Sequence, residues 1–265
     1  MLKIIVQPVD LSESLTDVKI RASFIERFGG REIVLVHVMN PGLGDKDMVQ
    51  SRLAHLADEL NQVGIQAKSV VTQGHVASQI TRTAMELAAD VIYLPASRKN
   101  VLVSSLLGST TEDVIRLSDI PVFIHKQRPV LVSTEKVHNI VFATDFRKAA
   151  SRVWLYVRML GRFVSKLTIL HVGERASDPD TEQLRRENVE MLLNELRAKF
   201  TDDFQEIALI SRIGSPAKHI IDVVEQIQAD LVVLGRLNEP FPSKLLGSTC
   251  SRVTSGVSSS VLLIP

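Results

Sequence analysis

An internal repeat limits what this chain can fold into. The pentapeptide Leu106-Leu107-Gly108-Ser109-Thr110 returns letter for letter as Leu245-Leu246-Gly247-Ser248-Thr249, 139 residues later in a chain of 265. Similar spacings relate Ala89-Asp90 to Ala229-Asp230, Gly74 to Gly214, His37-Val38 to His171-Val172 and Asp10 to Asp145. The length suits two ordinary domains, each large enough to bury its own core. The sequence therefore predicts one domain written twice.

Composition narrows the class of protein. A hydrophobic content of 45% with 23% charged residues is typical of a folded, soluble chain. The formal charge of +1 gives no reason to expect nucleic acid or membrane as a partner, and Arg185-Arg186 and Arg98-Lys99 are expected to be solvated surface. The single cysteine, Cys250, fits a reducing compartment. No apolar run approaches the length of a membrane span, so we expect a cytoplasmic protein.

Each half alternates short, β-branched apolar segments with longer amphipathic ones. The expected strands are Lys3–Val9, Glu32–Val38, Gln66–Val71, Val91–Leu94 and Val122–His125, then Asn139–Ala143, Lys166–His171, Glu206–Ile210, Leu231–Leu234 and Val261–Ile264. Four helical segments separate the strands of each half, which implies right-handed crossovers. The predicted fold is α/β, with two doubly wound five-stranded parallel-sheet domains in tandem. We place the domains at residues 1–126 and 137–265, joined by a linker at 127–136.

Ligands of such sheets bind beyond the carboxyl ends of the strands. This rule selects Asp10 and Asp145 after the first strand of each half, and Val38 and Val172 after the second. It also selects the loops after the fourth strands, residues 95–108 and 235–247.

Together these segments resemble the universal stress protein family in its tandem form, over essentially the whole chain. The matching motifs are the turns Pro8-Val9-Asp10 and Ala143-Thr144-Asp145, the His-Val strand ends, the glycine turns at Gly74 and Gly214, the Ala-Asp pairs and the two Gly-Ser-Thr segments. The resemblance implies the adenine nucleotide hydrolase-like fold, with the two domains paired as a pseudo-dimer. It also implies a role in the stress response. Some members of the family bind ATP or a related adenine nucleotide, and others do not.

By resemblance, the second half carries the better nucleotide site. Thr144, Asp145 and Val172 would hold the adenosine of ATP or AMP, and Gly235, Asn238, Gly247, Ser248 and Thr249 the phosphates. Glycines let the backbone approach phosphate closely, and asparagine tolerates left-handed geometry. The second loop is one residue shorter than the family pattern and contains Pro240-Phe241-Pro242. In the first half Pro95 and Arg98 replace the loop glycines, and proline cannot donate a backbone hydrogen bond.

Each candidate also has a structural interpretation. Asp10, Asp145 and the Ser-Thr pairs at 109–110 and 248–249 can be helix N-caps. His37 and His171 are expected to be core or hydrogen-bonding residues, and the histidines show no metal-ligand spacing. For Cys250 we favour a small buried thiol over a redox-sensitive thiolate at a helix N-terminus.

The sequence contains no nucleophile elbow, Walker loop or metal-ligand cluster, so no rapid catalysis is expected. Slow ATP hydrolysis or autophosphorylation stays open by resemblance. The leading hypothesis is a non-enzymatic stress protein in which an adenine nucleotide orders residues 235–247 and changes a surface that an unknown protein partner reads. The alternative is a nucleotide-free interaction module. A further homodimer of the tandem unit is left open.

Overall fold

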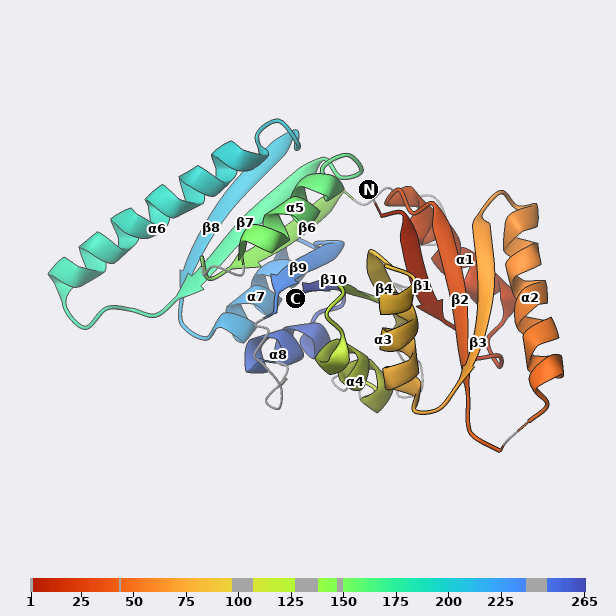
Figure 1. The fold of residues 1–265 in the computed structure, drawn as a ribbon. Helices are drawn as coiled ribbons and strands as arrows, with labels where there is room; N and C mark the ends of the chain where they lie inside the picture. Colours follow the sequence, from red (N-terminus) through yellow and green to blue (C-terminus); the bar gives the residue numbers. More distant parts are fainter. Residues whose placement is uncertain (1, 43, 97–106, 127–137, 147–149, 237–246) are drawn as a thin grey trace. The chain divides into compact units, whose positions relative to one another are not determined.

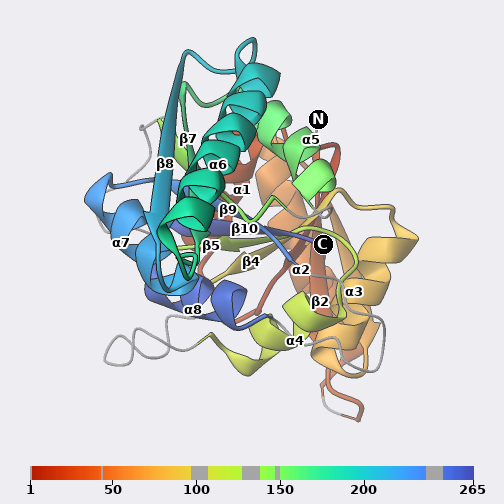
Figure 2. The same ribbon diagram turned by 90° about the vertical axis from the view of Figure 1, so that its left-hand side faces the viewer.

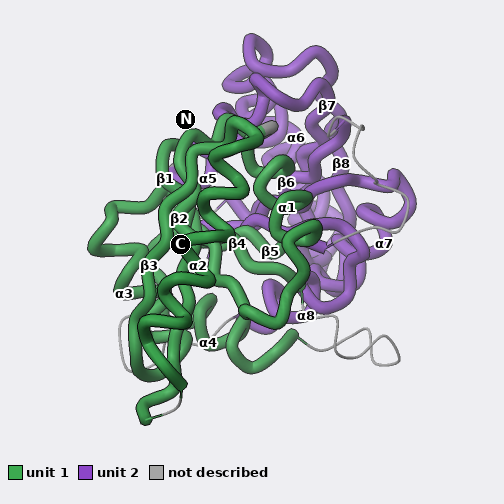
Figure 3. The backbone as a smooth tube through the Cα atoms, turned by 90° about the vertical axis from the view of Figure 1, so that its right-hand side faces the viewer, with its two compact units in different colours: residues 1–97, 107–125 green, residues 98–106, 126–265 purple. Residues whose placement is uncertain are grey.

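The computed structural model of the chain describes residues 2–42, 44–96, 107–126, 138–146, 150–236 and 247–265. These residues form two compact units, unit 1 up to residue 125 and unit 2 from residue 126 onwards (Figure 3). The linker predicted at residues 127–136 lies outside the described residues. Each unit is a doubly wound α/β domain, as the alternation of strands and helices predicts.

Unit 1 contains a five-stranded parallel sheet in the order β3-β2-β1-β4-β5. Its elements are β1 (Ile4–Pro8), α1 (Leu15–Arg27), β2 (Glu32–Met39), α2 (Lys46–Gln62), β3 (Gln66–Gln73), α3 (Val76–Glu86), β4 (Val91–Pro95), α4 (Ser109–Leu117) and β5 (Val122–His125). Helices α1 and α2 contact each other, as do α3 and α4, and the two pairs cover opposite faces of the sheet (Figure 1).

Unit 2 repeats this arrangement, with the strand order β10-β9-β6-β7-β8 and all neighbours parallel. Its elements are β6 (Asn139–Thr144), α5 (Ala150–Leu160), β7 (Lys166–Gly173), α6 (Pro179–Phe200), β8 (Glu206–Ile213), α7 (Pro216–Gln226), β9 (Leu231–Gly235), α8 (Ser248–Gly256) and β10 (Ser260–Ile264). The long helix α6 contacts β7 and β8 and lies over them in Figure 2.

The repeated Ala-Asp pairs stabilise the amino-terminal edge of each sheet. One carboxylate oxygen of Asp90 accepts hydrogen bonds from the backbone N–H groups of Lys3 and Ile4, at 2.6 and 3.0 Å. Asp230 accepts in the same way from His138 and Asn139, at 2.9 and 3.0 Å. This motif therefore fixes the start of the first strand in each unit, at the end of the sheet opposite to the carboxyl ends of the strands.

The repeated glycines have a conformational cause. Gly74 and Gly214 follow β3 and β8 with φ of +137° and +130°, a region that a residue with a Cβ rarely adopts. Each turn directs the chain from the edge strand into the next helix. These two glycines consequently belong to the fold, whatever else they do.

The core of unit 1 contains a cluster of buried polar side chains with unpartnered atoms. The side chains of Gln7, Arg21, Tyr93 and His125 are all less than one-tenth exposed. Six of the nine buried side-chain polar atoms that lack a partner within the described residues belong to these four. Apolar residues stand at three of the matching strand positions in unit 2, Phe142, Val233 and Ile264. In the sequence the strands are identified by their apolar residues, which do not predict this cluster of buried polar side chains.

Candidate functional site

A cleft of about 600 Å³ opens in unit 2 at the carboxyl ends of the central strands. Residues at the ends of β6, β7 and β9, the first turn of α8 and the start of α7 line it. Seven of the eight residues that the sequence selected lie around this cleft: Thr144, Asp145, Val172, Gly235, Gly247, Ser248 and Thr249. The eighth, Asn238, lies outside the described residues.

The cleft combines an apolar interior with a polar edge. Phe142, Val153, Leu170 and Leu234 line it and are themselves buried in the core of unit 2. Asp145 and the Ser248-Thr249 pair supply carboxylate and hydroxyl groups. A ligand with a flat apolar part and a charged part matches such a lining.

Helix α8 begins at the cleft, and no side chain of the described residues caps its first amide groups. Gly247 is the N-cap, and no side-chain hydrogen bond closes the first turn. Gly108 plays the same part for α4 in unit 1. The interpretation of Ser109, Thr110, Ser248 and Thr249 as N-caps is therefore wrong, because the glycine before each pair occupies that position. The first N–H groups of α8 stay available to an acceptor.

Packing favours a glycine at position 235 but not at position 247. A Cβ on Gly235 would lie 3.1 Å from Val153 Cγ2, so close packing of α5 on β9 favours glycine there. A Cβ on Gly247 would meet no atom within 4 Å, and its φ is −53°. Neither packing nor backbone conformation among the described residues requires a glycine at 247.

The aspartates after the first strands do not both cap the following helix. Helix α1 has Ser14 as its N-cap, whose hydroxyl accepts from the Asp17 N–H at 3.1 Å. Asp10 instead accepts from the Ser12 N–H at 3.0 Å, so its interpretation as an N-cap is wrong. Asp145 is exposed at the edge of the cleft.

The strand-end histidines tether neighbouring strands. His171 Nδ1 donates to the Thr144 carbonyl oxygen at 2.9 Å, and His37 Nδ1 donates to that of Val9 at the same distance. In unit 2 the ring of Phe146, a residue with φ of +60°, stacks on His171 at 4.5 Å between centroids. The expectation that these histidines are hydrogen-bonding residues is confirmed.

Cys250 lines the cleft as a protonated thiol. Its side chain is buried, and Sγ lies 3.6 Å from the Gly235 carbonyl oxygen. Burial raises the pKa of Cys250 to about 11; the charge of Arg236 opposes this shift and that of Asp145 adds to it. The buried-thiol interpretation is confirmed, and the helix N-terminus does not make this cysteine a thiolate.

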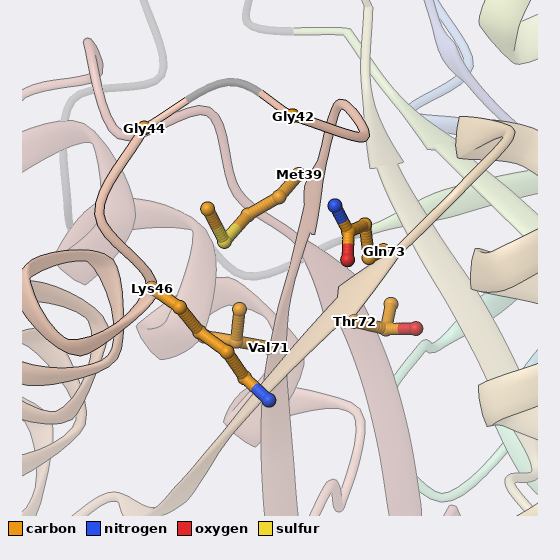
Figure 4. A pocket seen from close by; sticks show the side chains of 7 residues that line it. All are labelled: Met39, Gly42, Gly44, Lys46, Val71, Thr72 and Gln73. Carbon is orange, nitrogen blue, oxygen red and sulfur yellow. The ribbon is translucent and has the colours of Figure 1, made fainter.

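Unit 1 has a smaller pocket in a different place. It has a volume of about 240 Å³ and is lined by Met39, Gly42, Gly44, Lys46, Val71, Thr72 and Gln73 (Figure 4). These residues belong to the ends of β2 and β3, the segment between β2 and α2, and the first residue of α2, and neither Asp10 nor Gly108 is among them. Pro95, expected as the first residue of the loop, is the last residue of β4, whereas Arg98 lies outside the described residues.

One charged residue near the cleft was misjudged from the sequence. Arg185 was expected to be solvated surface, but its side chain is only 19% exposed and pairs with Glu182, which is 8% exposed. Arg186, at 60% exposed, does lie at the surface. The prediction for Arg185 is wrong because the acidic partner one helical turn earlier draws it against the protein. An i, i+3 Glu-Arg pair in the sequence was the available signal.

Two further searches cover only the described residues. Among them, no group of three His, Cys, Asp or Glu side chains is placed to hold a metal ion. Within the same residues, no helix has the length and apolar character that crossing a membrane requires.

Comparison with known proteins identifies the family. The universal stress protein family matches this chain twice, at residues 1–126 and 136–265. A universal stress protein from Archaeoglobus fulgidus has the same fold, with a TM-score of 0.72 and 22% identity, covering 100% of this chain and 96% of that one. A Pseudomonas aeruginosa protein of unknown function gives a TM-score of 0.71 and 17% identity, with 99% and 92% covered.

A curated relative matches over a shorter stretch. Universal stress protein MJ0577 of Methanocaldococcus jannaschii is 30% identical over 79 residues, which are 30% of this chain and 49% of that protein. The chain thus spans about half the length of the curated relative that it matches.

Proposed function

The chain belongs to the universal stress protein family, with two family domains in tandem, and we propose that unit 2 binds an adenine nucleotide, ATP or AMP. The observation that carries the proposal is the convergence of seven sequence-selected residues around one cleft. These residues come from the ends of three strands and the start of one helix. The first and the last of them are more than a hundred residues apart in the sequence.

The phosphates are proposed to lie at the start of α8. Several converging N–H groups and the positive end of the helix dipole favour an anion there. The open space beside Gly247 supports this location, since a phosphate oxygen can approach where a side chain would stand. Ser248 and Thr249 add hydroxyl donors from the same turn.

The adenosine is proposed to lie across the ends of β6 and β7. Strand β6 lies between β9 and β7 in the sheet, so Asp145 stands between the phosphate end and Val172. The Asp145 carboxylate is suited to accept hydrogen bonds from ribose hydroxyl groups. The buried apolar residues Leu170 and Leu234 offer a surface for the base.

We propose that this site binds without rapid turnover. Catalysis needs a nucleophile or base in a reactive state beside the ligand. In the described lining of the cleft, the high pKa of Cys250 keeps its thiol protonated at neutral pH, so this cysteine is not an activated nucleophile. The proposed output is a change of surface near Gly235 and Gly247 that a protein partner reads.

A calorimetric titration with ATP and AMP tests the proposal. Gly247→Val should weaken ATP binding by about ten-fold or more, because hydrogen bonds to charged groups are each worth about 1.5–3 kcal/mol. The matched control is Gly108→Val, which makes the same change at the N-cap of α4 and should leave binding unchanged. Heat from neither nucleotide would favour a ligand-free interaction module instead.

A further inference from the structure

Helix α6 holds an arginine in a fixed geometry beside the cleft. The carboxylate of Glu182 accepts from Arg185 Nε and Nη2, both at 2.9 Å, so the two groups form a bidentate pair. Glu182 also accepts from Arg186 Nε at 2.9 Å and from the Ala176 N–H at 3.0 Å. These donors hold the pKa of Glu182 well below its ordinary value, so the carboxylate stays charged and Arg185 stays in place.

The remaining nitrogen of Arg185 has no partner. Nη1 is buried and donates no hydrogen bond within the described residues. A buried donor without an acceptor costs about 1–3 kcal/mol, which a bound acceptor would recover. The bidentate pair fixes the direction in which this nitrogen points, because the guanidinium group is planar.

Gly173 is a residue of the cleft lining that lies next to Arg185. This last residue of β7 lines the cleft, and a Cβ on it would lie 2.9 Å from His171 Nε2 and 3.5 Å from Arg185 Nη1. Its φ is not in the left-handed region, so backbone conformation does not require glycine. The lack of a side chain at 173 therefore brings Arg185 Nη1 within reach of the cleft.

Unit 1 lacks the glycine and the glutamate of this arrangement. Met39 ends β2 where Gly173 ends β7, and Figure 4 shows its side chain in the pocket that Lys46 and Val71 also line. Helices α2 and α6 both start from an N-cap aspartate, Asp45 or Asp178. Counted from these caps, Val49 and the exposed Arg52 stand where unit 2 has Glu182 and Arg185. Among the described residues, unit 2 therefore combines a glycine at this strand end with a paired arginine next to it.

We propose that Arg185 Nη1 donates a hydrogen bond to a ring nitrogen of the base of the bound nucleotide, and so contributes to selecting the ligand. This inference rests on the proposed function. Strands β9 and β7 flank β6 on opposite sides, so Arg185 lies at the end of the cleft away from α8 and the phosphates. Glu182 neutralises its charge, which favours an uncharged acceptor over a phosphate. Arginine carries only donors, so the ligand must supply the acceptor.

The test measures the affinities of the full-length protein for adenosine and ATP by calorimetry. Arg185→Met should weaken both ligands by the same factor, about ten-fold or more, as expected for a lost hydrogen bond to a charged group. Arg52→Met is the matched control on α2 and should change neither affinity. Gly173→Ala should also weaken both, while leaving the Glu182–Arg185 pair intact. Thermal melts of each variant check that it is folded.

Adenosine analogues locate the acceptor. The analogues 1-deazaadenosine, 3-deazaadenosine and 7-deazaadenosine each lack one acceptor nitrogen of the ring. Wild-type protein should bind one of the three about as weakly as Arg185→Met binds adenosine, and the variant should lose nothing more with that analogue. The inference is overturned if Arg185→Met binds adenosine normally, if it weakens ATP alone, or if all three analogues bind like adenosine. Wild-type protein that binds neither adenosine, AMP nor ATP would overturn the proposed function as well.

Discussion

The buried His125 of unit 1 makes the stability of the fold depend on pH. Its ring lies 4.7 Å from that of Phe24 and 5.5 Å from that of Tyr93, and neither ring nitrogen has a partner among the residues that the structure describes. Burial, with a smaller contribution from the positive charge of Arg21, lowers the pKa of His125 from 6.5 to about 4. Arg21 is itself paired with Glu13, and Tyr93 stays uncharged because burial raises its pKa.

The linkage between proton binding and folding gives the sign and the size of this pH dependence. The folded state prefers neutral His125, so stability is lost as pH falls below the unfolded pKa of 6.5 and levels off below about 4. At about 1.4 kcal/mol per pKa unit, the loss reaches about 3 kcal/mol as an upper figure. The substitution His125→Ile isolates the contribution of His125, because isoleucine is the residue at the matching end of β10, Ile264.

Urea unfolding of wild type and His125→Ile from pH 8 to pH 4 measures the effect. Carboxylates titrate equally in both proteins, so the difference in free energy of unfolding reports on His125. The difference should be constant above pH 7 and grow in favour of the variant by up to about 3 kcal/mol toward pH 4. Hydrogen exchange should place the loss in β1, β4 and β5. A difference that does not change with pH would refute the reasoning.

Two further predictions concern the repeated aspartate and the cysteine. Asp230→Ala should destabilise the protein by about 1–3 kcal/mol, because two backbone N–H groups at the start of β6 lose their acceptor; denaturant unfolding measures this, and an unchanged midpoint would contradict the tether. Cys250 should resist a thiol reagent at pH 7 in the folded protein and react fully in urea, since its pKa is raised to about 11. Rapid native labelling would show that burial does not protect it.

The repeat and the alternation of segments were enough to predict the architecture. Within the described part of the chain, the ten strands and eight helices lie where the apolar and amphipathic segments are in the sequence. The site residues converge for the reason given at the outset, because the carboxyl ends of parallel strands share one edge. Asp145, Val172 and Gly247 thus reach one cleft although they are distant in sequence.

Side-chain partnerships were beyond the sequence pattern. From the sequence, Arg185 was expected to be a solvated surface residue. The packing of α6 beside Gly173 places it near the cleft. Arg21 and His125 fall within amphipathic or apolar segments, so periodicity gave no sign that they share a core. The N-caps were misassigned because serine and threonine usually hold that position, whereas here Gly108 and Gly247 precede them.

The measurement that tests the central claim most directly is the count of nucleotide carried by the purified protein. Acid extraction and chromatography, with the site saturated by added ATP or AMP, should give about one nucleotide per chain. Gly247→Val should abolish it, and Gly108→Val should leave it at one. Two nucleotides per chain would contradict the assignment of the site to unit 2 alone, and none would contradict nucleotide binding itself.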